Sequence, residues 1–285
     1  MNVVLPPLAA EQLWTFAGLP VTNTMINAWL ALATFFVLGI LIRFVWIRKT
    51  TVLGAPQGVL NFAERLVELM LDYMDRVTNN RKRSLHFLPI VGSLFLFILV
   101  SNWMGLLPGT GSIGLWMQHG AEQEFVPLFR PANTDLNMTL AMAAVAVVLS
   151  HVLGAVTIGF ARYAGRFIKI APLWRAVREV NPIGLLVAII EFFVGIIEIF
   201  SEIAKMISLS LRLYGNIFAG EVLLTVIASL VSVFVPLPFM ALEIIVGLVQ
   251  ATVFSILTLV YLNLATLEHE AHGAEEAHAT VAAAN

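Results

Sequence analysis

The stretch IGLLVAIIEFFVGIIEIFSEIAKMISLSLRLYGNIFAGEVLLTVIASLVSVFV, from Ile183 to Val235, is strongly apolar and contains no proline. As one helix it would be about 80 Å long at 1.5 Å per residue, more than twice the thickness of a bilayer's hydrocarbon core. A helix of that length must tilt steeply in a membrane or break. Pro236 and Pro238 supply a turn, and Phe239 to Thr266 returns as a second long helix. We therefore predict a steeply tilted helical hairpin.

The composition places the whole chain in the membrane class. Hydrophobic residues make up 59% of the 285 residues and charged residues only 12%, which excludes an ordinary soluble domain. There is no cysteine, so disulfides, thiolate chemistry and thiolate metal sites are excluded. The net charge of −2 does not indicate a nucleic-acid partner. The first residues have neither a signal-peptide nor a transit-peptide pattern, so we expect no cleavage.

Three apolar runs upstream of the hairpin are long enough to cross a bilayer. A charged, helically periodic segment ending near Asn80 indicates a helix at the membrane surface, and Pro108 to Thr134 is typical of an interfacial loop. We predict an all-α integral membrane protein with about five membrane helices plus an amphipathic surface helix, the last two membrane helices forming the tilted hairpin. The expected divisions are an external N-terminal segment (1–23), the first span (24–47), a cytoplasmic amphipathic segment (48–84), the second and third spans with connectors (85–181), the hairpin (182–268) and a cytoplasmic C-terminal tail (269–285).

The positions of the cations predict the orientation in the membrane. Nearly all lysines and arginines fall in two connectors, one before the second span and one after the third, whereas Arg130 is alone in the connector between those spans. Connectors rich in Lys and Arg face the cytoplasm. We therefore expect the N-terminus outside and the C-terminus in the cytoplasm.

A polar stripe runs along the first helix of the hairpin. Glu191, Glu198, Lys205 and Arg212 recur every seven residues, and each step of seven drifts only about 20° around a helix, so they share one face. A guanidinium stays charged in a protein, and placing one at bilayer depth costs a few kcal/mol or more. Arg212 is therefore a candidate functional residue. Glu221 lies nine residues further, close to half a revolution, and should point away from Arg212.

Simpler interpretations remain open for these residues. Glu191 and Glu198 are compatible with interfacial positions at the mouth of a helix, and Lys205 can snorkel to the membrane surface. Asn216 and Gln250 are polar residues of the kind that hydrogen-bond between membrane helices. Arg212 could instead form a static ion pair with Glu221 or with Glu243 of the return helix.

Several motifs resemble those of the a subunit of rotary F-type ATP synthases. The most specific is SLRLYGNIFAGE, which ends at Glu221, followed by Gln250 on the next helix and VYLNLA near the end of that helix. The sequences NWMGLLP and DLN, in the earlier spans, also resemble family motifs. The resemblance covers most of the chain, and the family is known for a steep helical hairpin.

The resemblance implies roles for individual residues. Arg212 corresponds to the arginine that faces the ring of c subunits, with Asn216 and Gln250 as its polar neighbours. The other matched positions line two half-channels: Glu198, Lys205 and Ser208 near the cytoplasmic one, Glu221 and Glu243 along the outer one, and Asp135 and Asn137 as candidates for the outer entrance. In the family one of the two outer positions is often histidine, whereas both are glutamate here. Two such carboxylates are expected to share a proton and to titrate as a pair.

The implied function is that of a stator subunit of the Fo sector, which couples the movement of protons or sodium ions to rotation of the c ring and to ATP synthesis. Such a subunit has no catalysis of its own, and we expect no cofactor and no metal. The implied partners are the c ring, peripheral-stalk b subunits, the F1 sector indirectly and the lipid bilayer, in a bacterial inner membrane.

Two other classes of membrane protein are compatible with a multi-span helical chain. An independent ion-coupled secondary transporter is the main alternative, but inverted repeats and paired broken helices are not apparent. A haem-bearing electron carrier would need paired histidines, and His86 and His151 are not spaced as a pair on one helix. Co-purification of the protein with an oligomeric ring would separate these classes.

Overall fold

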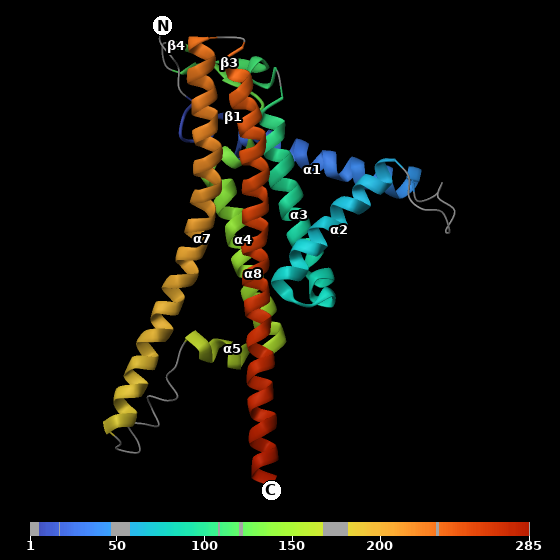
Figure 1. Ribbon diagram of the computed structural model, residues 1–285. Helices are drawn as coiled ribbons and strands as arrows, with labels where there is room; N and C mark the ends of the chain where they lie inside the picture. Colours follow the sequence, from blue (N-terminus) through green and yellow to red (C-terminus); the bar gives the residue numbers. More distant parts are fainter. Residues whose placement is uncertain are drawn as a thin grey trace. The chain divides into compact units, whose positions relative to one another are not determined.

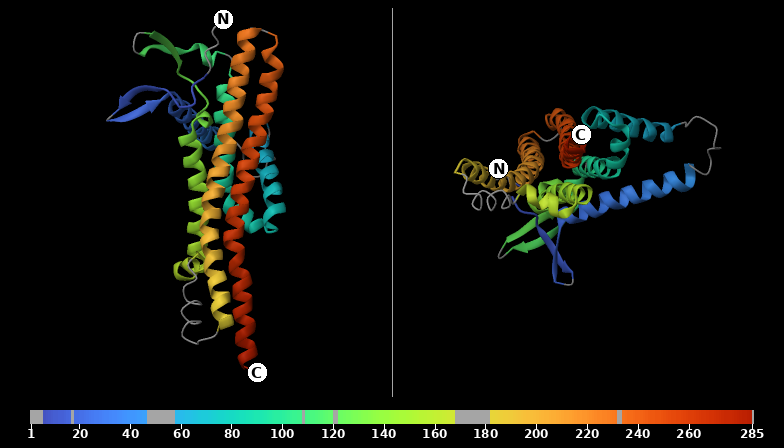
Figure 2. Two further views of the ribbon diagram at one scale, coloured as in Figure 1. Left: turned by 90° about the vertical axis from the view of Figure 1, so that its left-hand side faces the viewer. Right: turned by 90° about the horizontal axis from the view of Figure 1, so that it is seen from below.

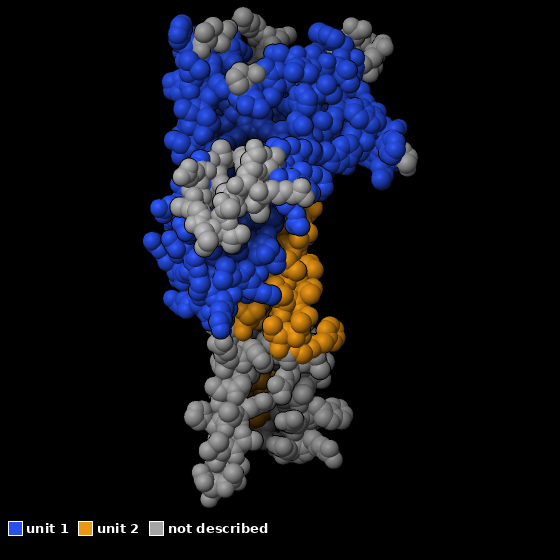
Figure 3. Space-filling model, turned by 90° about the vertical axis from the view of Figure 1, so that its right-hand side faces the viewer, with its two compact units in different colours: residues 1–139, 211–256 blue, residues 140–210, 257–285 orange. Residues whose placement is uncertain are grey.

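The computed structural model describes residues 6–16, 18–46, 58–107, 109–119, 122–167, 182–231 and 234–284 (Figure 1). The chain divides into two compact units, which Figure 3 colours separately: residues 1–139 with 211–256 form unit 1, and residues 140–210 with 257–285 form unit 2. The two long helices α7 (Pro182–Leu230) and α8 (Pro236–Ala284) contribute to both units.

The predicted fold class is confirmed by five helices that are long and apolar enough to cross a membrane. Within the described ranges they cover Asn23–Phe44, Arg81–Gly105, Leu136–Thr157, Ile183–Leu230 and Pro236–Thr266. Many large apolar side chains on these helices are exposed, among them Phe193, Phe200 and Ile245. Such surfaces are stable in lipid, where the solvent is as apolar as the side chains. The chain is therefore a multi-pass membrane protein.

Unit 1 begins with a strand pair, β1 (Gln12–Phe16) and β2 (Leu19–Thr22), which leads into α1 (Asn23–Leu41). The Thr22 hydroxyl accepts a hydrogen bond from the Met25 amide and so caps α1. A short π-helical segment, Ile42–Trp46, ends the span. The hairpin β1–β2 lies in the segment 1–23, for which the sequence predicted an external location but no strands.

The amphipathic helix α2 (Val59–Thr78) turns sharply into the second span, α3 (Arg81–Gly105). Asn79 adopts the left-handed conformation with φ of 50°, which asparagine tolerates, and the Asn80 side chain accepts a hydrogen bond from the Lys82 amide at the start of α3. Arg81 also donates to Asp75 at 2.6 Å. Arg81, Lys82 and Arg83, which belong to the basic connector predicted before the second span, thus form the first turn of α3.

The connector after α3 contains more regular structure than the predicted interfacial loop. Strands β3 (Gly114–His119) and β4 (Glu122–Pro127) form an antiparallel hairpin, flanked by the 3-10 turns η2 (Thr110–Ser112) and η3 (Ala132–Thr134). The rings of Trp116 and Phe125 pack edge to face across the hairpin, with centroids 5.4 Å apart. Neither strand alternates between apolar and polar residues, so the sequence did not predict the hairpin.

The third span is α4 (Leu136–Ile158), followed by the short helix α5 (Phe160–Phe167). Gly159, with φ of +93°, separates the two helices and ends the span. Gly154 allows close approach here, because a methyl group at this position would overlap the ring of Tyr163. The basic connector from 168 to 181 lies outside the described residues.

The predicted hairpin is formed by α7 and α8, which are 49 residues long each (Figure 2). Because α7 is continuous, its length of about 70 Å exceeds a hydrocarbon core and requires a steep tilt in a bilayer. Helix α8 continues to Ala284, so the expected C-terminal tail begins inside a helix. Within unit 1 the two helices are neighbours, joined by a 2.8 Å hydrogen bond from Asn216 Nδ2 to Gln250 Oε1.

Candidate ion-translocation site

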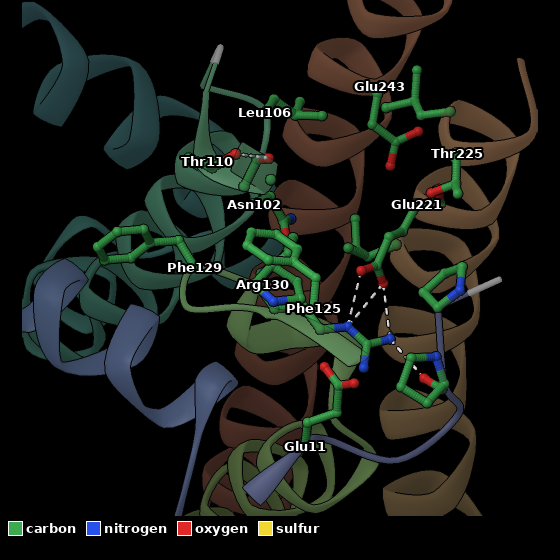
Figure 4. A pocket seen from close by; sticks show the side chains of 18 of the residues that line it. Glu11, Asn102, Leu106, Thr110, Phe125, Phe129, Arg130, Glu221, Thr225 and Glu243 are labelled. Atoms are coloured by element: carbon green, nitrogen blue, oxygen red, sulfur yellow. Dashed lines mark hydrogen bonds and ion pairs between the residues drawn. The ribbon is translucent and has the colours of Figure 1, made fainter. Parts of the chain in front are cut away.

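Unit 1 contains a cavity of about 660 Å³ whose wall is mostly apolar. It is lined by the N-terminal segment, the end of α3, the connector with β3 and β4, and the facing parts of α7 and α8. Four ionisable side chains reach it, and Figure 4 shows them from close by: Glu11, Arg130, Glu221 and Glu243. An apolar cavity with a few convergent charged groups is the usual form of a functional site.

Arg130 is almost completely buried, with 2% of its surface exposed, and it forms an ion pair with Glu221 of α7. Its Nε lies 2.9 Å from Oε1 and 3.1 Å from Oε2 of that carboxylate, and its Nη2 lies 2.9 Å from Oε2. The guanidinium also lies 6.0 Å from the centroid of the Phe218 ring. A buried guanidinium needs this degree of compensation, since it cannot lose its proton.

The same guanidinium holds the N-terminal segment. Nη2 donates to the carbonyl of Pro7 at 2.8 Å, and Nη1 donates to the carbonyl of Ala9 at 3.2 Å. The intervening carbonyl, that of Leu8, accepts a hydrogen bond from the Tyr214 hydroxyl at 3.2 Å. Three successive backbone carbonyls are thus bound by the connector and by α7, which makes the segment one wall of the cavity.

Helices α7 and α8 each place one carboxylate in the cavity, Glu221 and Glu243. Glu243 is 8% exposed. Its carboxylate lies against the backbone of Gly220, where a methyl group would overlap both oxygens. Within the described residues, neither a cation nor a hydrogen-bond donor pairs with it. The surroundings of Glu243 therefore differ from those of Glu221, although both line one cavity.

Helix α8 is held next to α3 by two hydrogen bonds to its backbone. Trp103 Nε1 donates to the Ile244 carbonyl at 3.2 Å, and Asn102 Nδ2 donates to the Gly247 carbonyl at 3.5 Å. Asn133 supports Asn102 with a 2.6 Å hydrogen bond from Nδ2 to Oδ1. The position of Glu243, one residue before Ile244, is therefore set by the NWMG motif.

Arg212 is exposed on α7, and in the described part of the chain no carboxylate pairs with it. Glu221 is paired with Arg130, in agreement with the half-turn offset from Arg212, and the static ion pair weighed from the sequence is not formed. One turn beyond Arg212, Asn216 donates to Gln250, which is 3% exposed and whose Nε2 has no hydrogen-bond partner among the described residues.

Unit 2 holds a separate polar cluster on α4, α5, α7 and α8. Lys205 Nζ lies 2.7 Å from Glu202 Oε1, and His151 Nε2 lies 3.6 Å from Glu202 Oε2. The Tyr163 hydroxyl is hydrogen-bonded to His151 Nδ1 at 2.5 Å, and Lys205 Nζ lies 5.5 Å from the centroid of the Tyr261 ring. Lys205 is therefore compensated by a neighbour on its own helix.

The remaining candidates are spread over both units. Glu198 is half-buried and Ser208 is exposed, both on the part of α7 that belongs to unit 2. Asp135 caps α4: its Oδ1 accepts from the Asn137 amide at 2.9 Å, and its Oδ2 accepts from the Thr24 hydroxyl at 3.2 Å. Asp135 and Asn137 do not line the cavity, and their role at an entrance stays a prediction.

Sequence reasoning missed Arg130 as a site residue and did not connect His151 with Glu202. One signal was available for Arg130, which is the only lysine or arginine between Arg83 and Arg162. A single cation in a connector whose other charged residues are carboxylates calls for a specific counter-charge. The identity of that counter-charge, 91 positions away in the sequence, is visible only in the structure.

Ionisable residues inside the apolar helices of a multi-span protein mark a functional site, and they are typical of ion-translocating membrane proteins. The family model described as "ATP synthase A chain" matches residues 26–263. ATP synthase subunit a of Gloeobacter violaceus is 32% identical over 260 residues, covering 91% of this chain and 90% of that protein. The corresponding subunit of Mycobacterium marinum is 32% identical over 262 residues, covering 90% and 92%, and that of Moorella thermoacetica is 26% identical over 251 residues, covering 88% and 94%. The chain belongs to the ATP synthase a-chain family of the membrane sector Fo.

Proposed function

We propose that the chain forms two ion half-channels of an F-type ATP synthase and presents Arg212 to a ring of c subunits. The observation that carries this proposal is the state of Arg212. It is an exposed guanidinium on an apolar helix, and no carboxylate of the described residues pairs with it, whereas the buried Arg130 has a complete set of partners. Charge at bilayer depth needs compensation, so Arg212 requires an anion from another subunit. A membrane carboxylate on each c subunit would supply it.

The ion path follows from the same requirement. A carboxylate on the ring must be neutral to face lipid, and it ionises only beside a cation or water. An ion enters through the outer half-channel, neutralises a ring carboxylate, travels with the ring and leaves on the other side of Arg212. The permanent charge of Arg212 prevents a direct leak between the two half-channels. A transmembrane potential adds about 2.3 kcal/mol per charge per 100 mV, which biases rotation.

Each half-channel would be formed by a different set of polar side chains. The cavity with Glu221 and Glu243 would form the outer half-channel, with Asp135 and Asn137 toward its entrance. Glu198, Lys205 and Ser208 would line the cytoplasmic half-channel. Asn216 and Gln250, joined by a hydrogen bond one turn from Arg212, would keep that part of α7 and α8 polar.

The proposed setting is a bacterial inner membrane, with the N-terminus outside and the C-terminus in the cytoplasm. The subunit would contact the c ring and the peripheral stalk, act on F1 only indirectly, and catalyse no covalent step itself. The distribution of Lys and Arg between the connectors supports this orientation.

The test is the substitution Arg212→Ala in the assembled complex, with ATP formation measured in energised vesicles. We expect synthesis to be abolished while ATP hydrolysis by F1 continues. Arg212→Lys should also be severely impaired, because an ammonium lacks the planar donor fork and loses its proton more readily when desolvated. Arg43→Ala, which removes an exposed cation at the end of the first span, is the matched control. Near-normal synthesis in Arg212→Ala would refute the proposal.

A further inference from the structure

We propose that Arg130 is a positioning residue of the outer half-channel, which assigns different roles to the two carboxylates. Arg130 holds Glu221 in place as its fixed counter-ion, and Glu243 is the carboxylate that takes up and releases the travelling proton. This inference rests on the proposed function, since it concerns the same ion path. It also differs from the expectation that Glu221 and Glu243 share a proton and titrate as a pair.

Arg130 has a complete set of hydrogen-bond and charge partners. All three guanidinium nitrogens are used, and they reach both oxygens of Glu221 and the carbonyls of Pro7 and Ala9. With 2% of Arg130 exposed, these partners supply most of the compensation for its charge. If Glu221 took up a proton, it would leave a buried guanidinium without counter-charge, which is strongly unfavourable. Glu221 is thus unsuited to exchange a proton in every transport cycle.

Glu243, in contrast to Glu221, has no cation beside its carboxylate among the described residues. It lines the same cavity but approaches the bare backbone of Gly220 rather than a cation. The other charged groups that line the cavity are already engaged: Glu11 accepts a hydrogen bond from Asn23 Nδ2 at 3.1 Å, and Arg130 and Glu221 bind each other. A carboxylate without such a partner gains and loses a proton without breaking an ion pair. Glu243 is therefore the exchanging group.

Arg130 also binds the N-terminal segment, which forms one wall of the cavity. Because Arg130 binds Glu221 and the Pro7 and Ala9 carbonyls through one rigid, planar group, the orientation of the carboxylate and the position of the N-terminal segment are coupled. Tyr214 binds the carbonyl between them. Lysine cannot reproduce this set of contacts, because an ammonium lacks the planar fork. A role in positioning therefore requires arginine, and not simply a positive charge.

The experiment compares pH profiles of ATP-driven proton pumping in inverted vesicles that contain the assembled complex. We expect Arg130→Gln to lower the rate about tenfold to a hundredfold, as a misplaced carboxylate should, and to change the shape of the profile, because Glu221 without its cation becomes a second titrating group. The double variant Arg130→Gln/Glu221→Gln should return to the parent's profile shape, since Glu243 again titrates alone. Glu243→Gln should no longer show the pH profile of the parent, because it removes the carboxylate that exchanges the proton. Arg43→Gln is the control for loss of a cation.

The amount of the subunit in the membrane is measured for each variant, and Arg130→Lys, which keeps the charge, serves where Arg130→Gln fails to accumulate. Arg130→Lys should also be slow and altered in profile. A parent-like profile in Arg130→Gln or Arg130→Lys, whatever the rate, would mean a merely structural role and would overturn the proposal. A double variant that keeps the altered profile would overturn it as well. Arg212→Ala in the same vesicles separates the two proposals: if that variant still pumps, the proposed function itself fails, independently of Arg130.

Discussion

Replacing Gly220 by alanine should separate the stability of this protein from its transport activity. A methyl group at position 220 would overlap both carboxylate oxygens of Glu243. These atoms are the far end of a flexible side chain, so the carboxylate can move away without a shift of α7 or α8. Alanine is also favoured over glycine inside a helix by about 1 kcal/mol. The variant should therefore fold and assemble at least as well as the parent.

Transport should suffer, because the Glu243 carboxylate must move by on the order of 1 Å to restore ordinary contact distances of about 3.5 Å. Misplacing a reacting group by about 1 Å can cost roughly a hundredfold in rate. We expect ATP-driven proton pumping by Gly220→Ala to fall by about tenfold to a hundredfold, at an equal amount of complex in the vesicles. Adding Glu243→Asp, which shortens the side chain by one methylene group, should recover part of the loss.

The matched control is Gly39→Ala in α1, where a methyl group would meet open space. It brings the same gain in helix propensity, and pumping should stay at the parent's rate. Normal pumping by Gly220→Ala would show that the position of the Glu243 carboxylate does not limit transport, and the reasoning on this pair would be wrong. Poor assembly of Gly220→Ala would contradict the expectation that the carboxylate yields.

Two further predictions concern the start of α4 and the sidedness of the ion path. Asp135→Ala should lower the stability of the subunit by about 1 kcal/mol, the usual cost of losing an N-cap, and should lower the temperature at which the detergent-extracted complex loses the subunit; Asp135→Asn, which still caps, should change it little. Because the chain has no cysteine, single cysteines can be introduced near Glu221, Glu243 and Glu198 and treated with thiol reagents on intact and inverted vesicles. Reagents should reach the first two regions from outside and the third from the cytoplasm, and labelling of all three from one side would contradict the two half-channels.

The fold was largely predictable from apolar length. The run from Ile183 to Val235 is too long for one perpendicular span and has no proline, which left only a tilted or a broken helix, and α7 is unbroken. The offset of nine residues likewise predicted that Glu221 turns away from Arg212. Both inferences use only the geometry of a single helix, which the sequence determines locally.

Contacts between distant segments were not predictable in the same way. Arg130 and Glu221 are 91 positions apart, and Pro7 and Arg130 are 123 apart, so no helical period relates them. His151 meets Glu202 across two different helices for the same reason. The hairpin of β3 and β4 was not predicted because its strands do not alternate between apolar and polar residues and lie in a connector rich in glycine and proline. Local periodicity predicts which residues share a face of one helix. It does not predict which residues of another segment contact that face.

The ion pair of Arg130 also sets an order of events during biosynthesis. At a ribosomal rate of about 5 to 20 residues per second, the 91 positions between Arg130 and Glu221 take roughly 5 to 20 s to translate. For that time the arginine has no counter-charge from α7, so the connector must stay hydrated at the membrane surface while later helices are inserted. Once Glu221 has been translated, Arg130 can bind it together with the carbonyls of Pro7 and Ala9. A nascent chain that stops before α7 therefore lacks the carboxylate that pairs with Arg130.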